Sequence, residues 1–223
     1  MQTAGKAGGF FITFEGPEGG GKSTQVHRLA AALADQRYSV WTTREPGGTR
    51  VGEMIRPILL GRGQAPMTPW SEALLFTAAR AQHVVEVIRP RLERGEIVLC
   101  DRYTDSTMAY QGYGRGLDLE TLRRLQSEAT GGLQPDLTLL LNLPVETGLS
   151  RIPRLARDRL DRETAAFHQR VRAGYQEMAA ADPRRWREVD AAAAEDQVAK
   201  DIFGLVSEAL AQAGVRPVQR RSA

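Results

Sequence analysis

The chain has 223 residues, 42% of them apolar, and a formal net charge of +3, which suits one buried core and leaves little room for a second domain. Its apolar stretches are too short to span a bilayer, and its first residues lack the apolar core of a signal peptide, so a cytoplasmic protein without membrane partners is expected. The arginine excess lies in clusters at 151–172, 184–187 and 216–221, which favours small phosphorylated ligands over nucleic acid.

The first predicted elements are a strand, a glycine-rich loop and a helix. The apolar run 10–14 indicates the strand, residues 16–23 fit the pattern G-x-x-x-x-G-K-[ST], and the apolar spacing over 22–36 predicts the helix. In this order the loop's N–H groups and the positive end of the helix dipole bind phosphate. Lys22 is expected to reach the outer phosphates of a nucleoside triphosphate, and the Ser23 hydroxyl to ligate Mg²⁺.

Further along the chain, strands alternate with longer helical patterns. Apolar runs at 39–42, 97–100, 137–141 and 186–189 predict strands, and patterns over 71–92, 119–130 and 198–209 predict helices. This alternation predicts a three-layer α/β/α domain over 10–213, with a central five-stranded parallel sheet of the P-loop nucleoside triphosphate hydrolase type. Residues 1–9 are predicted to be a flexible extension and residues 214–223 a flexible basic tail.

Charged residues follow the second and third predicted strands. In open α/β sheets, ligands bind beyond the carboxyl ends of the strands. The second strand leads into the turn Thr-Arg-Glu-Pro-Gly-Gly-Thr at 43–49, and the third leads into Asp101 and Arg102. Asp101 is therefore expected to hold Mg²⁺ together with Ser23, and Arg102 to bind phosphate. The alternative is a structural ion pair at the strand end.

Two pairs of residues with helical spacing suit a flat base. Phe76 and Arg80 are four residues apart and share a helix face, which allows stacking and edge-on hydrogen bonding. Thr107 and Gln111 repeat this spacing with Tyr110 between them, and their hydroxyl and amide groups suit the edge of a pyrimidine. The alternative is that Phe76 is a core residue and Arg80 a solvated one.

Residues 151–162 carry arginines at 151, 154, 157, 159 and 162. Such a segment repels itself unless polyphosphate is near, so we interpret it as a lid that closes over the transferring group. The alternative is an exposed basic helix.

The motifs together resemble those of bacterial thymidylate kinases, over a range from Phe10 to about Leu210. They are Phe-Glu-Gly-Pro-Glu-Gly-Gly-Gly-Lys-Ser-Thr at 14–24, the turn at 43–49, Asp-Arg-Tyr at 101–103, Ala-Tyr-Gln-Gly-Tyr-Gly-Arg-Gly at 109–116 and Pro-Asp-Leu-Thr at 135–138. The resemblance implies transfer of a phosphoryl group from Mg·ATP to thymidine 5′-monophosphate (dTMP), giving dTDP, and a homodimer.

The resemblance also implies roles for individual residues. Phe76 stacks on thymine, Tyr110 lies near the sugar's 2′ position, and Glu45 lies near the sugar and phosphate. The residues implied in dTMP binding are Glu45, Arg56, Phe76, Arg80, Arg102, Thr107, Tyr110 and Gln111, with Arg44 as a further phosphate ligand. Those implied in ATP binding are Gly16, Pro17, Glu18, Gly19, Gly20, Gly21, Lys22, Ser23, Thr24 and Arg151.

The implied catalytic residues are Lys22, Arg102, Glu18, Arg154, Arg157 and Arg159, and the implied metal ligands are Ser23 and Asp101. One branch of the family carries an arginine inside the phosphate loop. Here Glu18 is followed by Gly19, so the chain resembles the branch in which arginines of the lid assist transfer, with Arg162 as a further candidate.

Three alternative functions can be compared with the sequence. A regulatory GTPase would carry an Asn/Thr-Lys-x-Asp motif late in the chain, and none occurs. A non-catalytic nucleotide-binding scaffold has no reason to concentrate arginines in a lid. A kinase for another pyrimidine nucleoside monophosphate is the nearest alternative.

Overall fold

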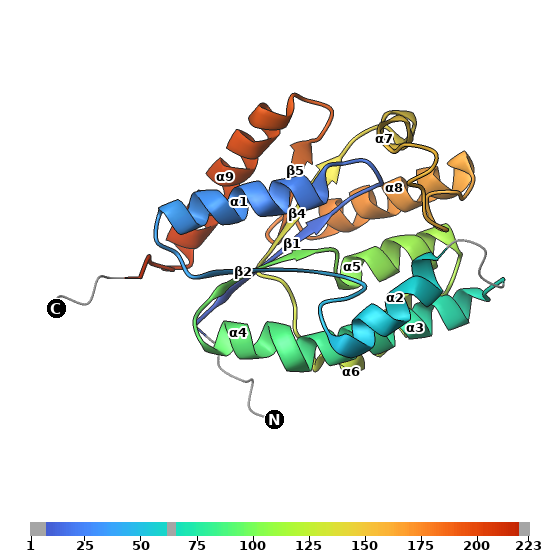
Figure 1. Ribbon diagram of the computed structural model, residues 1–223, viewed down its shortest axis with the longest axis horizontal. Helices are drawn as coiled ribbons and strands as arrows, with labels where there is room; N and C mark the ends of the chain where they lie inside the picture. The colour runs from blue at the N-terminus through green and yellow to red at the C-terminus, as the bar shows by residue number, and fades with distance from the viewer. Residues whose placement is uncertain (1–7, 62–65, 219–223) are drawn as a thin grey trace.

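The computed structural model describes residues 8–61 and 66–218, which form a parallel sheet covered by helices on both faces (Figure 1). The strands are β1 (Phe10–Glu15), β2 (Val40–Arg44), β3 (Ile97–Asp101), β4 (Leu137–Asn142) and β5 (Trp186–Asp190). All neighbouring strands pair in parallel, in the order β2-β3-β1-β4-β5. The predicted three-layer α/β/α class with five parallel strands is therefore confirmed.

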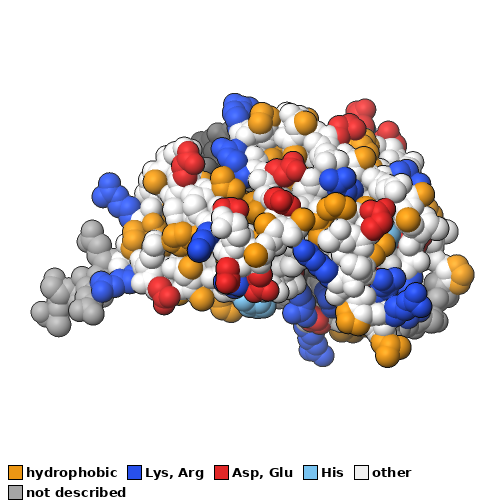
Figure 2. Space-filling view, turned by 90° about the horizontal axis from the view of Figure 1, so that it is seen from above, with side chains coloured by type: hydrophobic (Ala, Val, Ile, Leu, Met, Phe, Trp, Pro, Cys, Tyr) orange, Lys and Arg blue, Asp and Glu red, His pale blue; other side chains and the backbone are white. Residues whose placement is uncertain are grey.

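One face of the sheet is covered by α1 (Lys22–Asp35) and α9 (Glu195–Gln212), drawn above it in Figure 1. Successive side chains of a strand point to opposite faces, so Phe10, Ile12 and Phe14 of β1 share this one. They pack with buried residues of α1 such as Leu33 and of α9 such as Ile202. Seen from this side, basic and acidic side chains are interspersed over the described surface without a continuous basic stripe (Figure 2).

The opposite face is covered by a continuous helical stretch made of α3 (Pro69–His83), a π-helical segment η1 (Val84–Ile88) and α4 (Arg89–Glu93). Its residues Val84 and Ile88 pack on Phe11 and Val98, which alternate with the side chains of the first face. The helix predicted over 71–92 is thus present, and it begins at Pro69 behind the Thr68 N-cap, whose hydroxyl accepts from the Ser71 N–H.

The remaining helical segments cover the same side of the sheet or connect its strands. They are α2 (Arg50–Leu60), α5 (Thr104–Thr107), η2 (Met108–Gly114), α6 (Leu119–Thr130), α7 (Val145–Arg151) and α8 (Ala165–Ala181). Residues 152–164 form turns between α7 and α8, so the arginine-rich segment is not a helix beyond Arg151. The pattern analysis predicted α6, and it did not predict α2 or α8.

Most of the predicted flexible ends lies outside the described residues, namely 1–7 and 219–223. Within the described part of the tail, the Val218 N–H donates to the Arg37 carbonyl at 2.9 Å. No helix in the described ranges is long and apolar enough to cross a membrane.

Candidate active site

The glycine-rich loop follows β1 directly and curls around the start of α1. Gly16, Gly19 and Gly21 have φ values of 132°, 70° and 77°, a region that residues with a Cβ rarely adopt. A Cβ at Gly19 would lie 2.0 Å from the carbonyl oxygen of Gly148, which belongs to α7. The loop therefore needs glycine both for its turn and for its close contact with the neighbouring backbone.

Lys22 and Ser23 begin α1 and face the end of β3. The buried Lys22 Nζ donates to the carbonyl oxygens of Gly16 at 3.1 Å and Pro17 at 2.7 Å. Burial and the nearby Arg102 charge lower the pKa of Lys22 to about 8, so the side chain remains mostly protonated at neutral pH.

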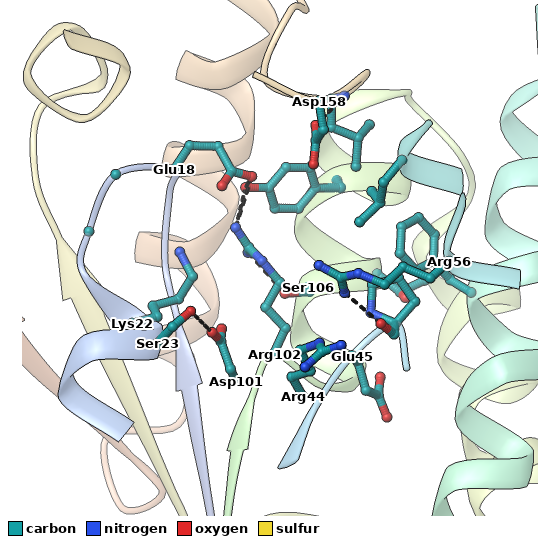
Figure 3. A pocket seen from close by; sticks show the side chains of 18 of the residues that line it. Glu18, Lys22, Ser23, Arg44, Glu45, Arg56, Asp101, Arg102, Ser106 and Asp158 are labelled. Carbon is teal, nitrogen blue, oxygen red and sulfur yellow. Dashed lines mark hydrogen bonds and ion pairs between the residues drawn. The ribbon is translucent and has the colours of Figure 1, made fainter. Parts of the chain in front are cut away.

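The predicted metal ligands are in direct contact. The Ser23 hydroxyl donates to Asp101 Oδ2 at 2.5 Å (Figure 3). Hydroxyl and carboxylate oxygens are the hard donors that Mg²⁺ takes from proteins, usually with waters and substrate phosphates completing the shell. The described residues contain no group of three or more His, Cys, Asp and Glu side chains arranged to hold a metal alone. The pair therefore fits an ion that arrives with its nucleotide.

Arg102 has a left-handed backbone, with φ of 70°, directly after β3. Its Nη1 donates to the Gly16 carbonyl at 3.2 Å and to the hydroxyls of Ser106 at 3.3 Å and Tyr175 at 3.2 Å. A non-glycine residue in this region carries strain, and such strain is concentrated at functional sites. Here it places the guanidinium group beside the phosphate loop.

Glu18 pairs with Arg102 across the loop. Arg102 Nη2 donates to Glu18 Oε1 at 2.8 Å, and the Tyr110 hydroxyl donates to the same oxygen at 2.6 Å (Figure 3). Burial alone would raise the pKa of Glu18, but the charges of Arg102 and Lys22 outweigh it and lower the pKa to about 2. Glu18 is thus ionised and holds Arg102 at the cavity.

Glu15, at the end of β1, supports Arg102 from behind, and the sequence analysis gave it no role. It is fully buried and accepts from the Tyr103 N–H at 2.7 Å, the Ser106 hydroxyl at 2.6 Å and the Tyr175 hydroxyl at 2.9 Å. Burial and the charge of Asp105 raise the pKa of Glu15 to about 7. The two hydroxyls that bond Arg102 are therefore anchored on a carboxyl that titrates near neutral pH.

This pKa predicts a pH dependence of stability. Between its ordinary value of 4.5 and about 7, Glu15 binds more protons in the folded than in the unfolded chain, so the free energy of unfolding falls as pH rises. Replacing Glu15 with glutamine should remove this contribution, on the order of 3 kcal/mol across the window. Urea unfolding of both proteins at several pH values measures it; parallel profiles would show that Glu15 does not titrate there. The pKa of Asp161 is also raised, to about 6, and this makes the free energy of unfolding fall with pH in the same way in both proteins. The difference between the two profiles therefore reports Glu15.

A cavity of about 340 Å³ extends from the phosphate loop to the helices of the opposite face. The predicted site residues that line it come from widely separated parts of the chain. They are Glu18, Gly19, Gly20, Gly21, Lys22, Ser23, Thr24, Arg44, Glu45, Arg56, Phe76, Asp101, Arg102, Thr107, Tyr110 and Gln111. The lining also includes Pro46, Leu60, Ser106, Asp158 and Leu160, to which the sequence analysis gave no role.

Arg44 and Arg56 lie on the cavity wall, Arg44 below Arg102 and Arg56 beside it in Figure 3. Arg56 Nη1 donates to the Pro46 carbonyl at 2.6 Å, and Arg44 pairs with Glu53 at 3.1 Å. Burial and the repulsion from the like charge of Arg44 lower the pKa of Arg56. An anionic group between them would relieve this repulsion.

Arg80 is not part of the described cavity lining, although it was expected to bond the base. Its Nε and Nη2 contact Glu45 Oε2 at 2.7 Å, and Nη2 donates to the Tyr103 carbonyl at 2.9 Å. Nη1 donates to Thr107 Oγ1 at 2.9 Å and Gln126 Oε1 at 2.5 Å. All five N–H groups therefore have partners, and a bond to the base requires one of these to be exchanged. The contact with the base stays a prediction.

The arginines of the segment 151–162 do not line the cavity either. Arg151 donates to the Ala191 carbonyl at 2.8 Å, and Arg157 to the Leu149 carbonyl at 2.6 Å, while Arg154 and Arg162 are exposed. A further contact joins Arg151 to the Gly19 carbonyl at 3.4 Å. Their proposed part in transfer therefore requires movement and stays a prediction.

The segment instead presents a carboxyl group and an apolar side chain to the cavity, Asp158 and Leu160 (Figure 3). Arg159, between them, points the other way: its Nε donates to the Leu59 carbonyl at 2.8 Å and its Nη2 lies 2.5 Å from Glu72. A turn-rich segment need not keep helical spacing, so the sequence did not indicate which of its side chains would face the cavity.

Phe76 lines the cavity from α3 while packing partly against buried apolar residues. With dTMP, the acceptor that the resemblance implies, Phe76→Ala should raise KM about tenfold or more with a smaller change in kcat, because base–aromatic stacking is worth roughly 1–3 kcal/mol and persists in ground and transition states. Steady-state kinetics with a folding check by circular dichroism tests this. An unchanged KM in a folded variant would show that Phe76 is a core residue that does not stack on the base.

A phosphate-binding loop on a parallel α/β sheet, with Lys22 and Arg102 lining one cavity, is the arrangement of a P-loop kinase that acts on a small phosphorylated acceptor. The family model for thymidylate kinase matches residues 14–202. Together with relatives at 50–58% identity over most of the chain, this shows that the chain belongs to the thymidylate kinase family.

The relatives cover almost the whole chain. The thymidylate kinase of Thermomicrobium roseum is 58% identical over 203 residues, covering 90% of this chain and 96% of the relative. That of Deinococcus radiodurans is 50% identical over 201 residues, covering 90% and 97%. The crystal structure of thymidylate kinase from Ehrlichia chaffeensis matches with a TM-score of 0.75 at 32% identity, covering 89% of this chain and 98% of that one.

Proposed function

We propose that this chain transfers the γ-phosphoryl group of ATP to dTMP, giving dTDP and ADP. One observation carries the proposal: a single cavity has the phosphate loop with Lys22 at one end and Phe76 with Gln111 at the other, and Arg102 lies between them. This arrangement suits two nucleotides whose phosphates meet near Arg102. Membership of the thymidylate kinase family supports thymine as the acceptor base.

The geometry supports a mechanism that depends on positioning and charge. Phosphoryl transfer needs donor and acceptor in line and the charge on the moving group neutralised, with little covalent work for the protein. Lys22 contributes positive charge on the donor side, and Arg102, Arg44 and Arg56 contribute it on the acceptor side. Glu18 keeps Arg102 in place until the acceptor phosphate competes for the guanidinium group.

We further propose Mg²⁺ as the cofactor, held by Ser23 and Asp101. The ion would supply positive charge between the phosphates of ATP. The two side chains already lie in hydrogen-bond contact with each other, so their oxygens point to one place on the rim of the sheet.

A coupled ADP-release assay across nucleoside monophosphates tests the function. With Mg·ATP, dTMP should give the highest kcat/KM among dTMP, dUMP, dCMP, UMP and CMP. A preference for dCMP, CMP or UMP would instead assign the chain to another pyrimidine monophosphate. Turnover of ATP without any acceptor dependence would reject a monophosphate kinase.

We also propose a homodimer through the outer faces of α2 and α3. Met54 and Ile58 on α2 and Trp70 and Leu74 on α3 are exposed with four-residue spacing, Met54 at 66% and Leu74 at 52%. Large exposed apolar side chains on adjacent helices are typical of an interface, and a two-fold axis would pair the same patch on two copies.

Sedimentation equilibrium measures the oligomeric state. The wild type should sediment as a dimer, and Leu74→Glu should shift it to the monomer while its circular dichroism spectrum is unchanged. Val218→Glu, in the described part of the tail and also exposed, is the matched control for an added charge and should leave the dimer intact. A monomeric wild type would reject the interface.

A further inference from the structure

Glu72 is a buried carboxylate of α3 that lies behind the base end of the cavity. Gln111 Nε2 donates to its Oε1 at 2.7 Å, and Arg115 donates to both of its oxygens at 3.2 and 3.1 Å. Arg159 Nη2 lies 2.5 Å from its Oε2. Burial alone would raise the pKa of Glu72, but the bonds from Arg115 and Gln111 and the charge of Arg159 lower it, so Glu72 is ionised.

An ionised carboxylate has no hydrogen to donate, so only the nitrogen end of the Gln111 amide can face Glu72. Gln111 is itself buried and lines the cavity with Phe76 and Thr107. Because its NH₂ group is turned to Glu72, its carbonyl oxygen is the end of the amide left for the cavity. The base end of the cavity therefore presents a hydrogen-bond acceptor at this position.

We propose that Glu72 is a positioning residue that selects the acceptor base, because it locks the Gln111 amide with its oxygen toward the ligand. Thymine and uracil carry a hydrogen on N3 that this oxygen accepts. The N3 of cytosine is an acceptor, so cytosine would place two lone pairs against each other. The inference rests on the proposed function, with the base placed against Gln111.

Selection of this kind is strong because the wrong base leaves buried polar groups without partners. It also differs from recognition of the thymine methyl group: dUMP has the same N3 hydrogen and no methyl. Glu72 should therefore control discrimination against cytosine and leave the preference between dTMP and dUMP unchanged.

The Glu72→Gln variant tests the proposal. Arg115 and Arg159 would draw the single carbonyl oxygen of the new amide, so its NH₂ group would face Gln111. Gln111 would then turn its oxygen inward and its NH₂ group to the cavity. The kcat/KM for dTMP should fall about tenfold and that for dCMP rise about tenfold, through KM, while the dTMP to dUMP ratio stays constant.

Arg115→Gln is the matched control, because it removes two hydrogen bonds to Glu72 and an ion pair with Glu163 while Gln111 keeps its partner. The Arg115→Gln variant should have a lower Tm, and the ratio of kcat/KM for dTMP to kcat/KM for dCMP should be unchanged. If Glu72→Gln does not fold, Glu72→Asp keeps the charge but withdraws it from Gln111, and should also lower the ratio.

An unchanged ratio in folded Glu72→Gln, or an equal change in Arg115→Gln, would overturn the inference. In the Gln111→Met background, Glu72→Gln should have no further effect on the ratio; a further effect would show that Glu72 does not act through Gln111. If the wild type does not phosphorylate dTMP, the proposed function fails before any variant is compared.

Discussion

Alanine at Arg102 is expected to lower turnover on the order of 10²–10³-fold, the usual cost of removing one preorganised positive group that faces the transferring phosphoryl. Alanine at Lys22 should cost a similar factor for a different reason. Lys22 lies on the loop that would hold ATP, whereas Arg102 is held by Glu18 and Tyr110 on the acceptor side. The Lys22 variant should therefore show its larger defect in kcat/KM when ATP is titrated, and the Arg102 variant when dTMP is titrated.

Separate titrations of ATP and dTMP check this division. Arg37→Ala is a suitable control, because Arg37 is the other described non-glycine residue with a positive φ, 66°, and is exposed far from the cavity. It should keep wild-type kinetics, which shows that replacing an arginine at a left-handed position does not by itself lower turnover. The same titration pattern for the Lys22 and Arg102 variants would contradict the assignment.

Among the single alanine variants of Arg154, Arg157, Arg159 and Arg162, at least one is expected to lose orders of magnitude in turnover at saturating ATP and dTMP, with ATP affinity changed much less. The reason is that Gly19 leaves the phosphate loop without an arginine, and the family resemblance then assigns the additional positive charge to the segment 151–162. In the structure Arg157 contacts a main-chain carbonyl and Arg159 contacts Glu72. Ligand binding must therefore shift these side chains to new partners.

Turnover at saturation and ATP binding by calorimetry measure the two quantities separately. Arg184→Ala, which removes an exposed arginine from the cluster at 184–187, controls for net charge. It should leave both turnover and ATP binding unchanged. Near-wild-type turnover in all four variants would make the segment a solvated basic loop. The transfer charge would then come from Lys22, from the metal, and from Arg102, Arg44 and Arg56 in the cavity lining.

The central strands β1, β3 and β4 could be predicted from the sequence because they are short apolar runs buried on both faces, such as Leu137–Asn142. The phosphate loop could be predicted because its geometry depends on glycines that lie consecutively in the chain. Helix α8 was missed although Thr164 caps it and Phe167, Val171 and Tyr175 repeat every four residues. The arginines interleaved with them were counted as part of a basic cluster, which hid the apolar spacing.

The roles of the buried carboxylates Glu15 and Glu72 could not be predicted, because the partners of these residues are distant in the chain. Glu15 stands in an apolar run, and its bond to Tyr175 crosses 160 residues. Glu72 and Gln111 are 39 residues apart and meet only because α3 packs beside η2. Helical spacing placed Arg80 on one face with Phe76, but spacing cannot show that the guanidinium group would already be fully occupied by Glu45 and its neighbours.

The contact between Gly19 and Gly148 joins the phosphate loop to the helix that leads into the arginine-rich segment. Neither position has room for a side chain: a Cβ at Gly148 would lie 2.2 Å from the Glu18 carbonyl oxygen. An arginine introduced at Gly19 would force α7 away from the loop, and α7 leads directly into the arginine-rich segment. In this architecture, an arginine at Gly19 would displace the helix from which residues 151–162 continue, so we expect a substitution in the loop to change the position of that segment as well.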